Sequence, residues 1–394
     1  MVVASSSRAS LCSRPIPRNR CCTRSRAVVA ASTRRDLLFA SAGAGVLLLP
    51  TQQASAAGVL ELRRDELKAA LAEDNEANTG YLEGEIKRIE SNAEYLGRTR
   101  PMVADGKGNF LQHAVLEVKD LDKAVTFWTQ GLGMKVNRAR GSGRGRQAFV
   151  SYGPETLTAD NGGKFALELV ENPNSTQDNS GQFFQIALPN SLRVNRLYNS
   201  GGDITYGYGY FEIDAPDGYK VVVYIDNRRD PFDLVGVYVD DVSAAATYYE
   251  KSFGMKADRK YGDVEVGRFE PKRTKGSVLV SFDDPQDNTS ILLVPRKKPA
   301  PATVKIAVLD KDVYERERML ASVGVTPKFI GEVPGTGGTK VALVAPTKGV
   351  PLVFVDYNDF EREQPEPAVL TVKEEIQEYV KMAKDDENAV EAMA

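Results

Sequence analysis

The chain has few of the residues that most often build redox, nucleophilic and metal sites. Its 394 residues include three cysteines, one histidine and one tryptophan. The cysteines (Cys12, Cys21 and Cys22) all lie near the N-terminus, so the rest of the chain can form no disulfide, thiolate metal site or cysteine nucleophile. The single histidine, His113, excludes any site that needs two histidine ligands.

Acidic residues are missing from the first 33 positions, which contain six arginines and seven serines. This composition is typical of a plastid or mitochondrial transit peptide. Arg34 and Arg35 follow, and then an uncharged run over residues 37–50. Paired arginines before such a run are typical of a twin-arginine export signal, and the run is too short for a permanent membrane anchor.

An A-x-A cleavage motif, Ala54-Ser55-Ala56, closes this region and predicts cleavage after Ala56. Residues 1–56 are therefore predicted to be a bipartite leader, a plastid transit peptide joined to a twin-arginine lumen signal. The mature protein is then expected in the chloroplast thylakoid lumen. The alternative is a disordered basic tail followed by one buried helix.

The charge of the mature protein restricts its partners. Without the eight arginines and one acidic residue of 1–56, the 51 basic and 54 acidic residues of the chain become 43 and 53, a net charge of −10. This charge argues against nucleic acid and anionic membrane surfaces as partners. We expect no stable membrane insertion, and a small-molecule ligand or a thylakoid protein complex as partner.

Helical segments are predicted at both ends of the mature chain. Residues 57–108 form the first, and residues 358–394 form a C-terminal tail in which Thr371 and Glu374 make a capping box. The apolar positions at helical spacing in the first segment are Leu67, Leu71, Leu82, Ile86 and Ile89.

An internal repeat lies between these ends. Residues 121–135 align without a gap with residues 242–256. Each copy follows an alternating strand that ends at an aspartate suited to capping a helix, Asp120 or Asp241. Each copy also has a second, weaker half with strands, a helix and a closing strand. The pattern predicts an α+β protein with four βαβββ units in two pairs, in domains 109–228 and 232–357.

Residues 112–135, with the motifs at 151–155, 167–172 and 215–220, resemble glyoxalase I of the vicinal oxygen chelate superfamily, and residues 353–360 resemble the end of its two-domain plant form. The resemblance covers about residues 110–360. It implies tandem domains that form two cupped mixed sheets, each holding one divalent metal. In this family the metal chelates two adjacent substrate oxygens, and a carboxylate ligand moves the proton.

The resemblance also assigns ligand positions. In the first repeat, His113 stands at the first position, Glu168 at the second and Gln185 at the third, while Val222 replaces the catalytic glutamate at the fourth. The second repeat offers Leu234, Leu292, Lys305 and Leu352. In the fused family form each site is built from both repeats, so His113 and Glu168 would share a site with Lys305 and Leu352, although the sequence alone does not settle which halves pair. No residue is assigned a catalytic role.

Substrate contacts of the family are partly retained. Asn172 keeps the position of an amide that binds glutathione, whereas Glu117 replaces an arginine and would repel the glutamyl carboxylate. The glycine-rich loop of the family is retained only in the second repeat, over residues 332–340.

Simpler interpretations stay open for several residues. A lone strand histidine is often only hydrogen-bonded, and Glu168 can be a structural ion-pair partner of His113 or Lys305. The Tyr/Gly alternation at 206–210 is interpreted as a strand edge rather than a pocket wall. The basic run 138–146 is interpreted as a solvated loop that is also a reasonable docking surface.

Two functions follow from these observations. The first is a lumenal glyoxalase I-like binding or assembly module that has lost metal catalysis and needs no cofactor. The alternative is a divergent metal-dependent lactoylglutathione lyase, or another enzyme of the superfamily acting on dicarbonyl-type substrates with Ni²⁺ or Zn²⁺. The sequence does not decide between a binding protein and an enzyme, and it names neither the ligand nor the oligomeric state.

Overall fold

The computed structural model describes residues 109–363, except 142–144, 156–162, 189–193, 266–269, 334–337 and 347, together with separate helical positions between 64 and 94. The predicted leader and the predicted helix after Thr371 lie outside the described residues. The described positions of the N-terminal segment are helical, and Leu67, Leu82 and Ile86 are buried there. In the described part of the chain, no helix is long and apolar enough to cross a membrane.

Four βαβββ units follow one another along the chain, as the repeat predicted. The first contains β1 (Phe110–Val118), α3 (Leu121–Thr126) with its π-helical continuation (Phe127–Gly131), β2 (Lys135–Arg140), β3 (Gln147–Ser151) and β4 (Ala166–Glu171). The second contains β5 (Gln182–Leu188), α4 (Val194–Asn199), β6 (Asp203–Gly207), β7 (Phe211–Asp214) and β8 (Lys220–Ile225).

The second repeat has the same order. Its first unit contains β9 (Phe232–Val239), α5 (Val242–Phe253), β10 (Lys256–Asp258), β11 (Val278–Ser281) and β12 (Ser290–Pro295). Its second unit contains β13 (Lys305–Asp310), α6 (Val313–Ser322), β14 (Phe329–Glu332), β15 (Lys340–Val344) and β16 (Leu352–Asp356). Helix α7 (Tyr357–Glu363) follows directly.

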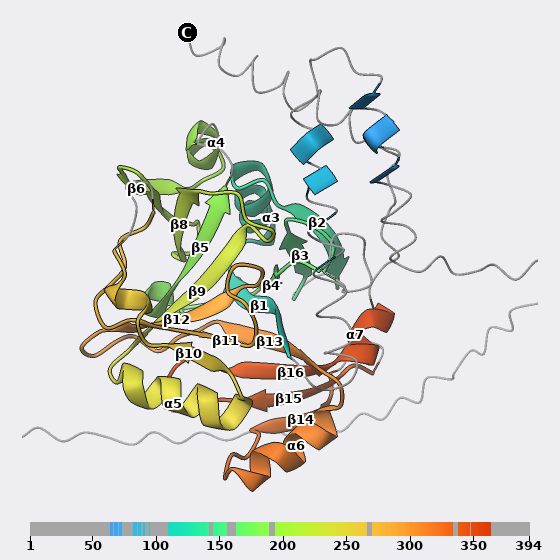
Figure 1. The fold of residues 1–394 in the computed structure, drawn as a ribbon, viewed down its shortest axis with the longest axis vertical. Helices are drawn as coiled ribbons and strands as arrows, with labels where there is room; N and C mark the ends of the chain where they lie inside the picture. The colour runs from blue at the N-terminus through green and yellow to red at the C-terminus, as the bar shows by residue number, and fades with distance from the viewer. Residues whose placement is uncertain are drawn as a thin grey trace, which may run out of the picture. The chain divides into compact units, whose positions relative to one another are not determined.

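The units pair across the two repeats into two mixed, eight-stranded sheets. Sheet A has the order β14-β15-β16-β13-β1-β4-β3-β2, and sheet B has the order β10-β11-β12-β9-β5-β8-β7-β6. The repeats meet in antiparallel pairs, β1 with β13 in sheet A and β5 with β9 in sheet B. Figure 1 shows both pairs side by side. The expected α+β fold with two mixed sheets is confirmed, and each sheet contains one unit of each repeat.

The repeated helices begin where the sequence predicted. Asp120 accepts a hydrogen bond from the Lys123 amide at 3.1 Å, and Asp241 accepts one from the Ala244 amide at 2.9 Å. These caps satisfy amides that have no partner within the helix. Helix α5 ends at Gly254, whose φ of 73° lies in the left-handed region that favours glycine.

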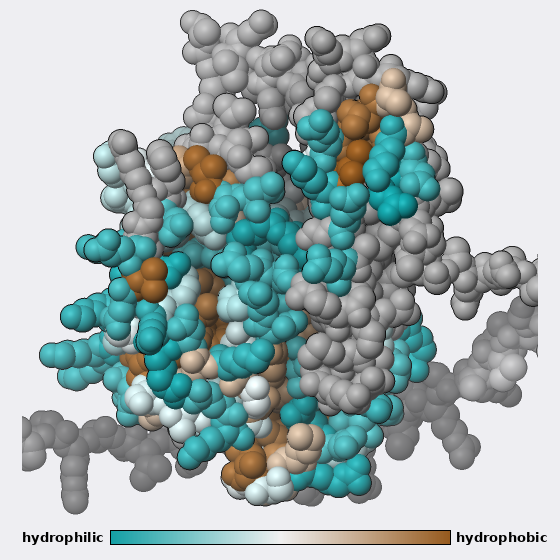
Figure 2. Space-filling view, in the orientation of Figure 1, coloured by the Kyte–Doolittle hydropathy of each residue, from teal (hydrophilic) through white to brown (hydrophobic). Residues whose placement is uncertain are grey.

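Each sheet has two chemically different faces, because successive strand side chains point to opposite sides. One face of each sheet, which we call the core face, packs into the main apolar core through residues such as Leu167. The other, which we call the site face, carries His113 and Glu168 in sheet A and Gln185 and Val222 in sheet B. On the side of the molecule drawn in Figure 2, polar residues predominate and apolar residues form separate spots.

Candidate functional site

On the site face of sheet A, the structure brings together the two predicted ligands His113 and Glu168. They lie on neighbouring parallel strands, β1 and β4, with His113 Nε2 3.3 Å from Glu168 Oε2. The side chains are 10% and 14% exposed, so this is a nearly buried pair. Lys305, the other partner considered for Glu168, lies on β13 opposite Val115 and is exposed.

The second ring nitrogen of His113 is also engaged. Gln112 donates from Nε2 to the Glu155 carboxylate at 3.2 Å, which fixes the orientation of its amide because a carboxylate only accepts. Its carbonyl oxygen therefore faces His113 Nδ1, with which it is hydrogen-bonded. Both ring nitrogens of His113 therefore face acceptor oxygens.

Arg138 and Glu155 extend this network as a buried ion pair. Arg138 donates to both carboxylate oxygens of Glu155, at 3.3 and 3.2 Å, and the two side chains are 8% and 0% exposed. The Arg138 guanidinium also lies 3.5 Å from the centre of the Phe149 ring. The prediction of a solvated basic loop over 138–146 is therefore wrong for Arg138, and Arg146 is held by Glu171 and Asp122.

The electrostatics around Glu168 favour its carboxylate form. Burial opposes ionisation, but the hydrogen bond from His113 and the positive charges of His113, Arg138 and Arg140 outweigh it. Together they lower the pKa of Glu168 below its ordinary value. Glu168 is therefore an anion neutralised by its neighbours.

The strand register corrects one position that the resemblance assigned. Leu352 belongs to the main core on the opposite face of β16 from the site. Ala307 lies opposite His113, and Val353 lies beside Ala307. The site face therefore presents Ala307 and Val353 next to His113.

The donor set on this face is small. Among the residues that the structure describes, no group of three or more His, Cys, Asp or Glu side chains is placed to hold a metal ion. His113 and Glu168 offer two donors, whereas a catalytic zinc site has three protein ligands. Apolar side chains from β1, β13, β15, β16 and α7 cover the neighbouring surface; they are Phe110, Ala307, Leu309, Val341, Val355, Tyr357 and Phe360.

The site face of sheet B contains a cavity of about 440 Å³. Gln185 on β5 is paired with Leu234 on β9 and Val222 on β8. Leu292 on β12 lies opposite Gly236 of β9 and lines the same cavity. The structure thus brings together the four residues that the resemblance assigned to this second site, of which only Gln185 carries an oxygen ligand.

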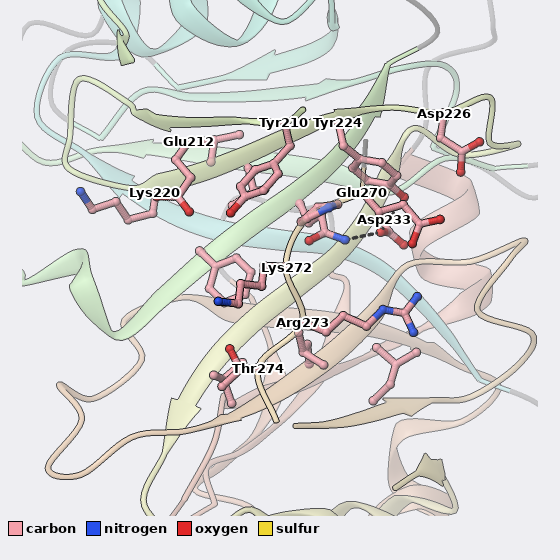
Figure 3. Close-up of a pocket in the computed structure, with 18 of the residues that line it drawn as sticks. Tyr210, Glu212, Lys220, Tyr224, Asp226, Asp233, Glu270, Lys272, Arg273 and Thr274 are labelled. Carbon is pink, nitrogen blue, oxygen red and sulfur yellow. Dashed lines mark hydrogen bonds between the residues drawn. The ribbon is translucent and has the colours of Figure 1, made fainter. Parts of the chain in front are cut away.

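Asp233 is the centre of the polar floor of this cavity. Its Oδ2 accepts hydrogen bonds from Gln185 Nε2 at 2.7 Å and from the Tyr224 hydroxyl at 2.9 Å. Its Oδ1 lies 3.3 Å from an Arg228 guanidinium nitrogen. Figure 3 shows Tyr224 and Asp233 at one end of the cavity and Glu212 and Lys220 at the other. Burial, followed by the charge of Asp233, raises the pKa of Tyr224, so this hydroxyl stays protonated.

The sequence interpretation missed Asp233, although the repeat offered a signal. The offset that aligns 121–135 with 242–256 also aligns Gln112 with Asp233. Both are buried polar residues directly before the first ligand position. The strand-edge interpretation of 206–210 was incomplete, because Tyr210 lines the cavity while Tyr208 is exposed.

Asn172, predicted to bind substrate, has a partner within the protein. It donates from Nδ2 to Glu117 Oε1 at 2.8 Å, and Gln177 donates to the other oxygen of the same carboxylate at 3.2 Å. Glu117 therefore accepts a hydrogen bond from the Asn172 amide, the group that the resemblance assigned to glutathione binding. This pair lies on sheet A and its following loop, away from the residues that line the cavity.

Comparison with known proteins agrees with this architecture. The chain is 28% identical over 276 residues to a lactoylglutathione lyase of Arabidopsis thaliana, covering 64% of this chain and 93% of the relative. It is 27% identical over 283 residues to a lactoylglutathione lyase of Oryza sativa subsp. japonica, covering 64% and 91%. The crystal structure of glyoxalase I from Zea mays has the same fold, with a TM-score of 0.51, 24% identity, and coverage of 65% of this chain and 95% of that one.

The family profile matches both halves of the fold. It covers residues 110–223 and 232–362, which include the strands of both sheets. The chain therefore belongs to the Glyoxalase/Bleomycin resistance protein/Dioxygenase superfamily.

Proposed function

We propose that the protein is a glyoxalase I-like binding protein, which takes a small organic molecule into the sheet B cavity without a metal and without glyoxalase I chemistry. The observation that carries the proposal is the cavity itself. About 440 Å³ of space lies over a floor whose four ligand positions offer one neutral amide, Gln185. Cavities of ~300–1,000 Å³ are typical of small-molecule sites.

The arrangement in sheet A supports the same proposal. A histidine binds a metal through a bare nitrogen lone pair, and both nitrogens of His113 face acceptor oxygens. Metal binding through Nε2 would therefore replace the contact with Glu168, whereas the contact of Nδ1 with Gln112 is one that a metal-binding histidine also makes. The positions next to it on the site face are occupied by Ala307 and Val353, which carry no donor.

One observation favours the alternative of a divergent metal-dependent lyase. His113 and Glu168 are adjacent on the site face, at two positions that the family uses for metal, and lactoylglutathione lyases are among the relatives of the chain. In that case the metal would supply Lewis-acid chemistry, and His113 and Glu168 would hold it. The two functions therefore differ in whether the folded protein retains a divalent ion.

Metal loading tests the proposal. The purified mature protein, incubated with Ni²⁺ or Zn²⁺ and then desalted, is expected to retain far less than one ion per chain by mass spectrometry. Background binding should be small because the sequence after residue 56 has one histidine and no cysteine. Retention of about one ion per chain in the wild type, lost in His113→Ala, would contradict the proposal and favour the lyase.

We propose in addition that the protein acts in the thylakoid lumen, on the basis of the predicted leader. Replacing Arg34 and Arg35 with lysine is expected to stop delivery to the lumen while leaving plastid import intact, because the twin-arginine route requires the arginine pair. Fractionation of imported protein from isolated chloroplasts measures both steps. Normal lumenal arrival of the double variant would contradict the twin-arginine prediction, whereas failure of import would contradict the transit peptide.

A further inference from the structure

We propose that the ligand of the sheet B cavity is an uncharged, planar aromatic compound whose hydroxyl or N–H group donates a hydrogen bond to the side-chain carbonyl of Gln185. This inference rests on the binding function proposed above and names the chemical class of its ligand. It is drawn from the orientation of Gln185, the shape of the aromatic wall and the balance of charges around the cavity.

The orientation of Gln185 is fixed by Asp233. A carboxylate only accepts hydrogen bonds, so the Gln185 amide must turn its NH₂ group toward Asp233, which it reaches at 2.7 Å. The side-chain carbonyl oxygen of Gln185 then faces the cavity that this residue lines. Tyr224 and Arg228 also bind Asp233, so this carboxylate is fully engaged in holding the floor. The floor therefore presents a hydrogen-bond acceptor, the side-chain carbonyl of Gln185, and a matching ligand carries a hydrogen-bond donor.

An acceptor at this position disfavours a free dicarbonyl compound as the ligand. A dicarbonyl group presents two adjacent acceptor oxygens, which would face the carbonyl oxygen of Gln185 without a proton between them. A buried acceptor left without its donor costs binding free energy. A phenol-type hydroxyl or an aromatic N–H supplies the missing proton directly.

A flat ring forms part of the floor beside Gln185. Phe183 lies opposite Gly236 in the β5–β9 pair, and a Cβ at Gly236 would come within 2.1 Å of the Phe183 ring. The ring thus lies across the strand over the glycine, in space that a side chain would otherwise fill. Tyr238 is its neighbour, with ring centres 5.8 Å apart and a tilt of 45°. This pair gives a planar ligand an aromatic surface to stack on.

The remaining walls are also suited to a ring. The apolar side chains of Val222, Leu279 and Leu292 line the cavity beside Tyr261. Tyr261 is covered by the Arg273 guanidinium, 4.0 Å from its ring centre. Through this cation–π contact, Arg273 is bound within the protein and holds the Tyr261 ring in place as part of the cavity wall.

The charges around the cavity balance. Among the described lining residues, the cations are Lys220, Arg228, Lys272 and Arg273, and the anions are Glu212, Asp226, Asp233 and Glu270. Figure 3 shows both signs at the rim, with Lys272 and Arg273 between the two ends. Equal numbers of each sign give no net attraction for a charged ligand. The aromatic wall and the carbonyl oxygen of Gln185 then determine which ligand the cavity binds.

Three matched probes test the proposal by calorimetry on the metal-free mature protein. They are 2-naphthol, 2-methoxynaphthalene, which keeps the rings and lacks the donor, and 2-decalol, which keeps the hydroxyl and lacks the aromatic rings. We expect 2-naphthol to bind about 10- to 100-fold more tightly than 2-methoxynaphthalene, because the ether leaves Gln185 without its donor. We expect 2-decalol to bind more weakly than 2-naphthol, because it cannot stack on Phe183.

Two variants assign the effect to the residues. Gln185→Met is expected to remove the preference for 2-naphthol over its methyl ether, and Gly236→Ala to weaken both naphthalenes by displacing Phe183. The comparison of probes on the wild type needs no variant, so it holds even if a variant fails to fold.

Each outcome has one consequence. Equal affinity of the wild type for 2-naphthol and its methyl ether, or no binding of any probe, would overturn this inference. Binding that is blocked by Val222→Trp, without a preference for the donor, would leave the proposed function standing and reject only the ligand class. Retention of a stoichiometric metal ion would reject the proposed function itself, and that measurement uses none of these probes.

Discussion

Replacing Glu155 with alanine is expected to lower the free energy of unfolding by about 3–5 kcal/mol, since removing one partner of a buried ion pair leaves the other charge uncompensated. Arg138 would lose both hydrogen bonds to the carboxylate in a setting where its side chain is 8% exposed. Gln112 would lose the acceptor that fixes its amide and, through that amide, the position of His113. Urea unfolding followed by the fluorescence of the single tryptophan, Trp128, measures the change.

Two matched variants control this prediction. Glu155→Gln keeps the shape and one acceptor oxygen, so it should cost less than the alanine variant. Glu250→Ala removes an ion pair with Arg259 that is similar in geometry, with contacts at 2.8 and 2.6 Å, but much more exposed. Exposed ion pairs contribute little to stability. If Glu155→Ala cost no more than Glu250→Ala, the network would have no special role in stability.

The fold could be predicted largely because residues within each repeat mark where its helices begin and end. Asp120 and Asp241 mark helix starts through local hydrogen bonds, and Gly254 marks a helix end through its backbone conformation. Such signals act over a few residues, so they are readable in one sequence. The pairing of the repeats across two sheets depends on contacts between β1 and β13 and between β5 and β9, and it was accessible only through the family resemblance.

The site could be predicted less well because side-chain direction depends on register. The β1–β13 pairing shifts between Leu111 and His113, and the β5–β9 pairing shifts between Gln185 and Ile186. A shift of one residue moves a side chain to the other face of a sheet. The alignment was one residue out on β16, where it assigned Leu352 to the site and the structure places Val353 on that face.

The buried charges were the other omission. Arg138 and Asp233 lie in polar stretches of sequence, where a solvated side chain is the ordinary expectation. Their burial depends on partners from other segments, such as Glu155 for Arg138 and Gln185 on β5 for Asp233, and no local pattern encodes such a pairing. The repeat offset between Gln112 and Asp233 was the one signal available, because it aligned two polar residues at the start of otherwise apolar strands.

The mature protein is expected to show negligible lactoylglutathione lyase activity with Ni²⁺ or Zn²⁺. The family resemblance places the proton-moving carboxylate at Val222 and Leu352. The site faces of these two closing strands present Val222 and Val353, neither of which carries a carboxylate. Losing a positioned acid–base group typically costs ~10²–10⁴ in rate. The contact of His113 Nε2 with Glu168 would also have to give way to a metal bound at that nitrogen.

Turnover of the methylglyoxal–glutathione hemithioacetal, measured with each metal for the wild type and for His113→Ala, tests this account most directly. We expect both proteins to convert the substrate no faster than the metal-containing buffer alone, with His113→Ala changing stability but not the rate. A robust rate in the wild type that disappears in His113→Ala would show that His113 anchors a working metal site, and it would contradict the binding function proposed here.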